Sequence, residues 1–334
     1  MTQTGDKRDS AKSDFDADYH ALTAAAGYRV ASERIVVRMV GDDRVPFLNG
    51  MCSNDIKQLA PGSLVPALLL TEHAHVVAEV YVWNKGDALL IEADRTTWPG
   101  AREQLEKFLV ADDVEMEELD GTAVIDIKGP SAAGVVGTIA GQAAASLAPW
   151  KHLAIGNAEI ANLPRLGGPG FTVLAENDSA AEIVKNLERG GAALGIREVG
   201  AEALEVIRIE NGVARIGVDT GPKTIALEAR MQSAISFSKG CYVGQETIER
   251  ATSRGGLKKR LFGLRIIGSR VPELNATVTL EGKDVGRVTS AALSPRLGVL
   301  GLSLLHHSAW EVDTQVTIED ARGELKAAVS DLPF

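Results

Sequence analysis

The sequence predicts an α+β protein with two mixed α/β domains and a C-terminal antiparallel β-barrel. The chain has 334 residues, which is long for a single hydrophobic core. Strand-like and helix-like segments alternate to about residue 250, as is typical of mixed α and β layers. After residue 254 the segments become short, strand-like and separated by glycine, proline and acidic turns, which indicates a small barrel.

The first α/β region begins at residue 34, where the pattern becomes regular. Residues 34–41 (RIVVRMVG) predict a strand that turns into a short helix, which Asp42 and Asp43 can cap. Strand-like runs at 64–83 and 87–93 flank a turn, and Thr97 with Pro99 begins the next helix.

The second α/β region repeats this alternation. Residues 123–129 (AVIDIKG) predict a strand, and a helix follows near Ser131. A further helix at 180–191 is capped by Asp178 and closed by two glycines. We therefore predict two interleaved α/β domains over 19–254. The barrel domain covers 255–334, and 1–18 is predicted to be a disordered tail.

Charge and cysteine content narrow the class of protein. The net charge of −10 argues against direct nucleic-acid binding and against docking on an anionic membrane. No run of 18 apolar residues occurs, and the acidic first twenty residues match neither a secretory signal nor a transit peptide. The two cysteines cannot form a disulfide framework, so we expect a cytoplasmic protein.

One of these cysteines lies in an unusual segment, KGCYVGQE at 239–246. The neighbouring Lys239 and a helix predicted to follow would both lower the pKa of the Cys241 thiol and favour the reactive thiolate. The alternative is a small buried apolar residue, the usual role of a lone cysteine, but apolar neighbours are mostly missing. Cys52 is predicted to be such a buried structural thiol.

Four segments occur in an order that resembles a known family. They are FLNGMCSNDIKQLAPG, IRIENGVARIGVD, KGCYVGQETIERATSRG and VGRVTSAALSP. Together they resemble the folate-binding YgfZ family, relatives of the glycine-cleavage T-protein (aminomethyltransferase). The resemblance implies a three-domain cloverleaf around a channel that holds tetrahydrofolate or a one-carbon derivative. It also implies a role in maturation or repair of iron–sulfur proteins, including enzymes that modify tRNA, with iron–sulfur client or scaffold proteins as partners.

The resemblance also implies site residues. Glu210 matches the glutamate that binds the pterin, whose N–H donors suit a carboxylate. By periodicity alone Glu210 is equally a solvent-facing residue that alternates with Ile207 and Ile209 on a strand, where Arg208 would share its face and could pair with it. The predicted catalytic residues are Cys241 and Lys239, and the predicted folate-binding residues are Glu210, Asn54, Asp55, Arg208, Tyr242 and Arg250.

Several polar residues have a second interpretation. Asn54 and Asp55 lie at the channel mouth by resemblance, but they could equally cap a helix. His73 and His75 share one face of a strand without a third ligand nearby, so no metal site is predicted. The basic cluster at 254–260 is an ordinary solvated linker or, alternatively, a contact for a polyglutamate tail or an acidic partner.

One departure from the T-protein pattern bears on activity. T-proteins carry an Asp-Asp pair after the strand matching HVV, whereas this chain has Ala78 and Glu79. Losing a carboxylate that manages protons at a folate nitrogen disfavours aminomethyl transfer. The sequence therefore favours a folate-binding accessory factor for iron–sulfur proteins, with an aminomethyltransferase and a pure folate-binding module as alternatives.

Overall fold

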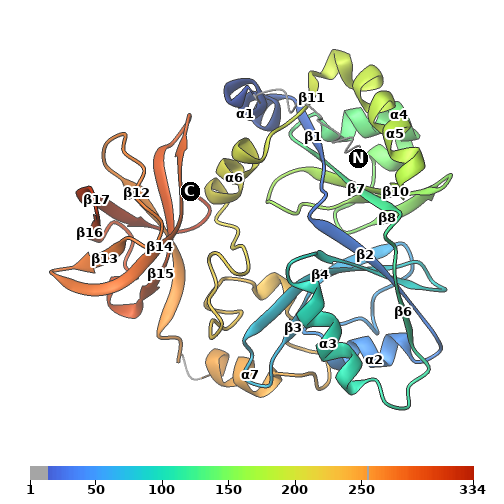
Figure 1. The fold of residues 1–334 in the computed structure, drawn as a ribbon, viewed down its shortest axis with the longest axis horizontal. Coiled ribbons are helices and arrows are strands. Elements are labelled where there is room, and N and C mark those ends of the chain that lie inside the picture. The colour runs from blue at the N-terminus through green and yellow to red at the C-terminus, as the bar shows by residue number, and fades with distance from the viewer. Residues whose placement is uncertain (1–13, 254–255) are drawn as a thin grey trace, which may run out of the picture.

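The computed structural model describes residues 14–253 and 256–334, and it confirms the predicted α+β class. Two sheets, one mixed and one antiparallel, lie one above the other, and a closed six-stranded barrel stands beside them (Figure 1). Helices cover the outer face of each sheet, so the two sheets face each other in the middle of the molecule.

The first sheet has six strands in the order β11-β1-β7-β10-β9-β8. Helices α4 and α5 pack on its outer face through alanine, valine and leucine side chains. The elements are β1 (Ala26–Val30), β7 (Thr122–Lys128), β8 (His152–Ile155), β9 (Ala158–Asn162), β10 (Gly170–Glu176), β11 (Ile196–Glu198), α4 (Ala132–Ala145) and α5 (Asn177–Gly191).

The second sheet has five strands in the order β3-β4-β5-β2-β6. Helices α2 and α3 bury Phe47, Leu48, Trp98 and Leu105 against its outer face. The elements are β2 (Arg34–Val40), β3 (Ser63–Leu70), β4 (Val76–Asn84), β5 (Leu89–Asp94), β6 (Glu115–Glu118), α2 (Arg44–Met51) and α3 (Trp98–Phe108).

The chain visits the two sheets alternately. Strand β1 lies in the first sheet, β2 to β6 form the second, and β7 to β11 return to the first. An apolar layer between the sheets joins Trp83 and Leu64 of the second sheet to Val124 and Leu174 of the first. Because this layer belongs to both sheets, their separation is fixed, and polar groups at its edge keep a defined geometry.

The barrel closes through pairing of β12 with β17, so it has no free edge strand. Its strands are β12 (Lys259–Ile266), β13 (Thr277–Leu280), β14 (Lys283–Ser294), β15 (Gly298–His306), β16 (Gln315–Asp320) and β17 (Gly323–Ser330). Helix α6 (Ala201–Glu210) lies between the barrel and the first sheet, and α7 (Gln245–Ser253) precedes the barrel (Figure 1).

The N-terminal part of the prediction needs correction. Helix α1 (Phe15–Ala24) begins before the end of the expected tail at residue 18, and residues 1–13 lie outside the described residues. Asp18 is only 1% exposed because its carboxylate accepts from the Gly200 N–H at 2.8 Å and pairs with Arg197 at 2.9 Å. This anchoring holds α1 against α6, so residues 15–18 are not a tail.

The segment around Glu210 is also different from the prediction, because residues 201–210 form a helix. Ala203, Leu204 and Ile207 follow helical spacing and pack against α1, which overrides the strand-like alternation of IRIE. Two helix caps differ as well. Asp43 precedes α2 but makes no capping bond, and Asp178 lies inside α5, which begins at Asn177.

Within the described residues, no helix is both long and apolar enough to cross a membrane. The cytoplasmic location stays a prediction. Among those residues no group of three or more histidine, cysteine or acidic side chains could hold a metal ion.

Candidate functional site

Two cavities open between the sheets and the segment that follows α6. They measure about 280 Å³ and about 330 Å³, and both are lined by Glu79, Tyr81, Arg165, Val213 and Ala214. Because they share this wall, they are two halves of one central channel. We name them the Arg34 half and the Trp150 half, each after a residue that lines only that half.

Strand β4 places the two polar residues of the shared wall. Glu79 and Tyr81 are two positions apart, so both point to the face that meets the other sheet, while Val80 and Val82 point to the helices. Tyr81 is 4% exposed, and burial raises the pKa of its phenol, which therefore stays neutral.

Arg165 is the centre of a buried ionic network. Its Nη2 donates to Glu92 Oε1 at 2.5 Å, and Asp126 lies 3.4 Å away. Arg34 Nε binds the same oxygen of Glu92 at 2.9 Å. Burial opposes the charge of Arg165, but Asp126 and Glu92 raise the pKa of its guanidinium above the ordinary value. Both guanidiniums lie over the Tyr81 ring, at 4.7 Å for Arg165 and 5.6 Å for Arg34.

Glu79 differs from the other acids of this network because its carboxylate has no hydrogen-bond or ion-pair partner among the described residues. Burial raises the pKa of Glu79, and the charges of Arg34 and Arg165 only partly oppose this. A half-buried carboxylate that faces both halves of the channel can therefore accept N–H donors or hold a proton for a ligand.

The Trp150 half has mainly neutral walls. Pro66, Trp150 and Met231 line it, and the Trp150 ring stacks on Tyr81 with an angle of 14° between planes and 6.5 Å between centroids. Trp150 and Arg230 have φ of 65° and 59°, in the left-handed region that residues other than glycine rarely adopt. Such backbone strain clusters at functional sites.

The Arg34 half is walled by helix α6. Glu205 and Arg208 lie three residues apart on one helical face, and Arg208 donates to both oxygens of Glu205, at 2.9 and 2.7 Å. Arg208 also donates to buried Asp219 at 2.6 Å and to Ser290 of the barrel at 2.6 Å. Arg208 was predicted to bind folate, but its nitrogens are already used to join α6 to the barrel.

The structure places Glu210 outside the channel. It lines neither half, is 4% exposed, and Oε1 accepts from Tyr19 at 2.6 Å and from Ser294 at 2.5 Å. Arg296 lies 3.3 Å from Oε2. Two residues on a helix are about 200° apart, so Glu210 and Arg208 do not share a face. Glu205 is the acid of α6 that reaches the channel.

The KGCYVGQE segment binds the end of α2. Lys239 Nζ donates to the carbonyl oxygens of Asn49, Cys52 and Asn54 at 2.5, 2.8 and 2.7 Å. These three bonds use all three ammonium protons. Burial lowers the pKa of Lys239, against the opposing influence of Cys52 and Asp55. The structure therefore gives Lys239 an architectural role and does not show the pairing with Cys241 that the sequence predicted.

Cys241, a predicted catalytic residue, is exposed and lines neither half of the channel. Its neighbours are fixed. Tyr242 is buried, with Lys239 Nζ 5.2 Å from its ring centroid, and the Val243 N–H donates to the Gly50 carbonyl at 3.2 Å. Burial raises the pKa of the Cys52 thiol to about 11, so Cys52 is a neutral structural thiol.

The remaining predicted residues also lie outside the channel. Asn54 accepts from its neighbour's N–H at 2.9 Å and donates to the Pro66 carbonyl at 2.7 Å, while Asp55 accepts from the Gln58 N–H at 3.1 Å. This is the turn-capping interpretation of the pair. Arg250 is exposed on α7 and pairs with Glu246 at 3.0 Å.

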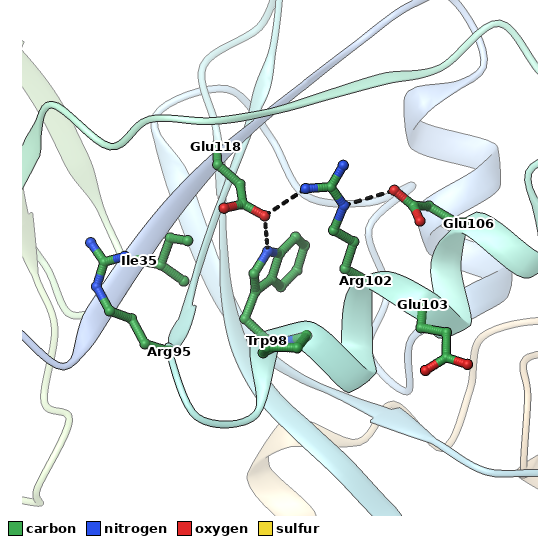
Figure 2. Close-up of a pocket in the computed structure, with 8 residues that line it drawn as sticks. Ile35, Arg95, Trp98, Arg102, Glu103, Glu106 and Glu118 are labelled. Atoms are coloured by element: carbon green, nitrogen blue, oxygen red, sulfur yellow. Dashed lines mark hydrogen bonds and ion pairs between the residues drawn. The ribbon is translucent and has the colours of Figure 1, made fainter.

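A third cavity, of about 400 Å³, lies beside α3 and shares no lining residue with the channel. Figure 2 shows that three of its charged groups are paired: Glu118 accepts from Trp98 Nε1 at 2.9 Å and from Arg102 at 2.8 Å, and Arg102 also binds Glu106. Because these groups are paired and largely exposed, we do not assign a ligand to this cavity.

Most of the channel residues could not be identified from the sequence. Glu79 stands out there only as a departure from the Asp-Asp pair, and Tyr81, Arg165 and Glu205 belong to none of the motifs. One signal was present, since Glu79 and Tyr81 interrupt the apolar strand VVAEVYVW at two positions of the same face. Arg165 and Glu205 come from distant segments, so only the fold brings them together.

Comparisons with known proteins agree with this architecture. The family model described as the GCVT N-terminal domain matches residues 4–239, and the glycine cleavage T-protein C-terminal barrel domain matches residues 259–334. A crystal structure of the glycine cleavage system aminomethyltransferase T from Bartonella henselae is similar, with a TM-score of 0.85 and 20% identity over 95% of this chain and 88% of that chain.

Two curated relatives are similar over most of their length. An Arabidopsis thaliana chloroplast protein named as a transferase is 28% identical over 89% of this chain and 68% of its own. The aminomethyltransferase of Bacillus subtilis is 26% identical over 95% of this chain and 90% of its own.

Two sheets that the chain visits alternately, a closed barrel and the channel beside them define a protein with the T-protein fold. The chain belongs to the glycine-cleavage T-protein family. Membership in this family implies a tetrahydrofolate ligand.

Proposed function

We propose that the protein binds a reduced folate in the central channel and acts as a YgfZ-type accessory factor for iron–sulfur proteins. The free carboxylate of Glu79 on the wall shared by both halves of the channel carries the folate assignment. A pterin is flat and presents several N–H donors, and Glu79 with the Tyr81 and Trp150 rings fits that shape and chemistry. The same residues would hold the pterin at the shared wall.

The residues of the channel define what the chain contributes chemically. When bound, tetrahydrofolate supplies a carrier for one-carbon groups. When ionised, the Glu79 carboxylate would accept a hydrogen bond from an N–H donor of the pterin. Because burial raises the pKa of Glu79, the carboxyl group would also be able to hold a proton beside a folate nitrogen. Arg165 and Arg34 keep Tyr81 in place through stacking and through Glu92.

The accessory role is supported by the KGCYVGQE segment. Gly240 and Cys241 are exposed, while the flanking Lys239 and Tyr242 are anchored. A thiol displayed on a fixed loop suits contact with another protein more than contact with a ligand inside the channel. Iron–sulfur client or scaffold proteins as partners rest on the resemblance of this segment to the YgfZ family.

Aminomethyl transfer is the second candidate; loss of one carboxylate of the pair disfavours it, but Glu79 supplies the other. The chain keeps one carboxylate in the channel where T-proteins carry the Asp-Asp pair, and the Bacillus subtilis relative is named aminomethyltransferase. A glycine-cleavage assay with this protein as the only T component separates the two functions. We expect negligible turnover, whereas turnover comparable with a T-protein would favour the transferase.

Calorimetry with 5-formyltetrahydrofolate tests folate binding. Glu79→Gln should weaken binding by about 2 kcal/mol, the size of a charged hydrogen bond. Glu103→Gln is the matched control, because Glu103 lines only the cavity beside α3. Unchanged affinity in Glu79→Gln, or no binding by the wild type, would contradict the assignment.

Complementation in a strain lacking this gene tests the accessory role. Cys241→Ser should lose support of iron–sulfur enzymes while keeping its folding and folate affinity, because the side chain is exposed and outside the channel. Full complementation by Cys241→Ser would remove Cys241 from the mechanism.

A further inference from the structure

The rim of the Trp150 half carries an arginine in a strained and fixed position. Arg230 lines this half, has a φ of 59° and is 12% exposed at its side chain. Its Nε donates to the Leu261 carbonyl at 2.6 Å, and its guanidinium lies 4.7 Å from the Phe262 ring centroid. Contacts on two sides hold the guanidinium in one orientation at the cavity wall.

The acidic partner of Arg230 is poorly matched to it. Asp331 Oδ1 lies 2.5 Å from Arg230 Nη1, but the Asp331 side chain is 67% exposed. Arg230 Nη2 is buried and has no hydrogen-bond partner among the described residues. A carboxylate that approached both terminal nitrogens could form two parallel bonds, whereas Asp331 forms an ion pair with only one.

The charges around this pair also favour an anion. Burial lowers the pKa of Arg230, and the hydrogen bond from Arg230 lowers the pKa of Asp331. The charge of the Arg260 guanidinium, on β12, acts on both groups in the same direction. Within this group of three side chains, Arg230 and Arg260 carry two positive charges against the one negative charge of Asp331. Of the basic cluster at 254–260, this arginine is one member that the structure describes, and residues 254 and 255 lie outside the described residues. The rim also includes Leu332 and Pro333, which follow Asp331 directly.

We propose that Arg230 binds the terminal carboxylate of the folate's glutamate tail and that Asp331 occupies this position until the ligand displaces it. This proposal rests on the proposed folate-binding function. The pterin lies at the wall shared by the two halves, and the tail leaves through the Trp150 half toward the rim. The ligand carboxylate binds Nη1 and Nη2 of Arg230, and the freed Asp331 becomes fully solvated.

Calorimetry with two ligands tests the proposal. 5-Formyltetrahydrofolate carries the glutamate tail, and 6-methyltetrahydropterin has the ring without any carboxylate. Asp331→Asn should tighten binding of the tailed folate about two- to five-fold, because an exposed ion pair no longer competes. Arg230→Gln should weaken it about tenfold. Neither variant should change the affinity for 6-methyltetrahydropterin.

Two controls make the outcomes distinct. Arg287→Gln removes an arginine of the barrel that pairs with Asp284 and lines neither half of the channel, so it should change neither affinity. Because Arg230→Gln also loses a backbone contact, Asp331→Asn, at an exposed side chain, gives a result that does not depend on folding. If Arg230→Gln and Asp331→Asn both bound the tailed folate with the affinity of the wild type, the role of Arg230 would be overturned, while the proposal of folate binding would stand. Failure of the wild type to bind either ligand would overturn both proposals.

Discussion

Replacing Lys239 with methionine should destabilise the protein without slowing the reaction of Cys241 with an alkylating reagent. Methionine keeps the length and apolar stem of the lysine but removes the ammonium. The carbonyl oxygens of Asn49, Cys52 and Asn54 would lose a partner that now lies 2.5 to 2.8 Å away. Asn49 lies in the last turn of α2, and Cys52 and Asn54 follow that helix. The contact between the end of α2 and the KGCYVGQE loop should therefore become weaker.

The size of the effect follows from the three bonds. A hydrogen bond to a charged group contributes about 1.5–3 kcal/mol. Three bonds from one nitrogen are not additive, and Lys239 is only half-buried, so we expect a loss of about 3 kcal/mol in the free energy of unfolding. For a protein of this size that corresponds to a melting temperature lower by roughly 4–5 °C.

Thermal unfolding and alkylation kinetics measured on the same variants test this prediction. Lys57→Met is the matched control, because Lys57 is exposed on the neighbouring turn and its ammonium has no partner among the described residues, so its loss should cost less than about 0.5 kcal/mol. Lys239→Arg should be intermediate, since a guanidinium keeps the charge but cannot direct three protons from one atom. A Lys239→Met variant with wild-type stability and slower alkylation of Cys241 would refute the architectural role.

Three further variants test other parts of the structure. Glu79→Gln should stabilise the protein at pH 8 and have little effect at pH 4. Because the pKa of Glu79 is raised in the folded protein, its contribution to stability is present below the unfolded-state pKa of about 4.3 and is lost as pH rises through the folded-state pKa. Urea unfolding would contradict this if the free energies of unfolding of variant and wild type differed by the same amount at both pH values. Glu210→Ala should lose about 3 kcal/mol of stability and keep its folate affinity, because the Glu210 carboxylate lies outside the channel and accepts hydrogen bonds from Tyr19 and Ser294. If calorimetry showed weaker folate binding by a stably folded variant, Glu210 would be assigned to pterin binding instead. Gly244→Ala should cost about 2 kcal/mol in thermal unfolding, because its φ is 86° and an added Cβ would lie 2.7 Å from the Thr71 carbonyl oxygen, whereas Gly240→Ala meets no atom within 4 Å; equal melting temperatures would show that the loop can shift.

The fold class could be predicted because it depends on local patterns. Alternating strands and helices before residue 250 and short strands after it are properties of neighbouring residues, and they indicate mixed layers and a barrel. Helix α6 could not be predicted in the same way. Its IRIE segment has strand-like alternation, and the helix is selected by packing of Leu204 and Ile207 against α1, about 180 residues earlier in the chain.

The candidate site was predicted less well than the fold because its residues meet only in three dimensions. Arg165 follows β9 of one sheet, while Glu79 and Tyr81 lie on β4 of the other. No spacing in the sequence indicates this contact. The motif residues were easier to find, but a motif does not say which of its members face a ligand. Lys239 shows the difference, since its type suggested thiolate activation and its position gave it three carbonyl partners.

The KGCYVGQE segment and the channel are joined through one stretch of chain. Met231, Gln232 and Ser233 line the Trp150 half, and a few residues later the backbone of Ser236 donates to the Ser53 carbonyl at 2.9 Å. The buried Ser53 hydroxyl donates to the Ala234 carbonyl at 2.6 Å. A ligand that displaced residues 231–233 would therefore also shift the KGCYVGQE segment, which Lys239 binds to the end of α2. Since Cys241 is displayed just beyond these attachments, they connect the channel wall to the segment that displays the thiol.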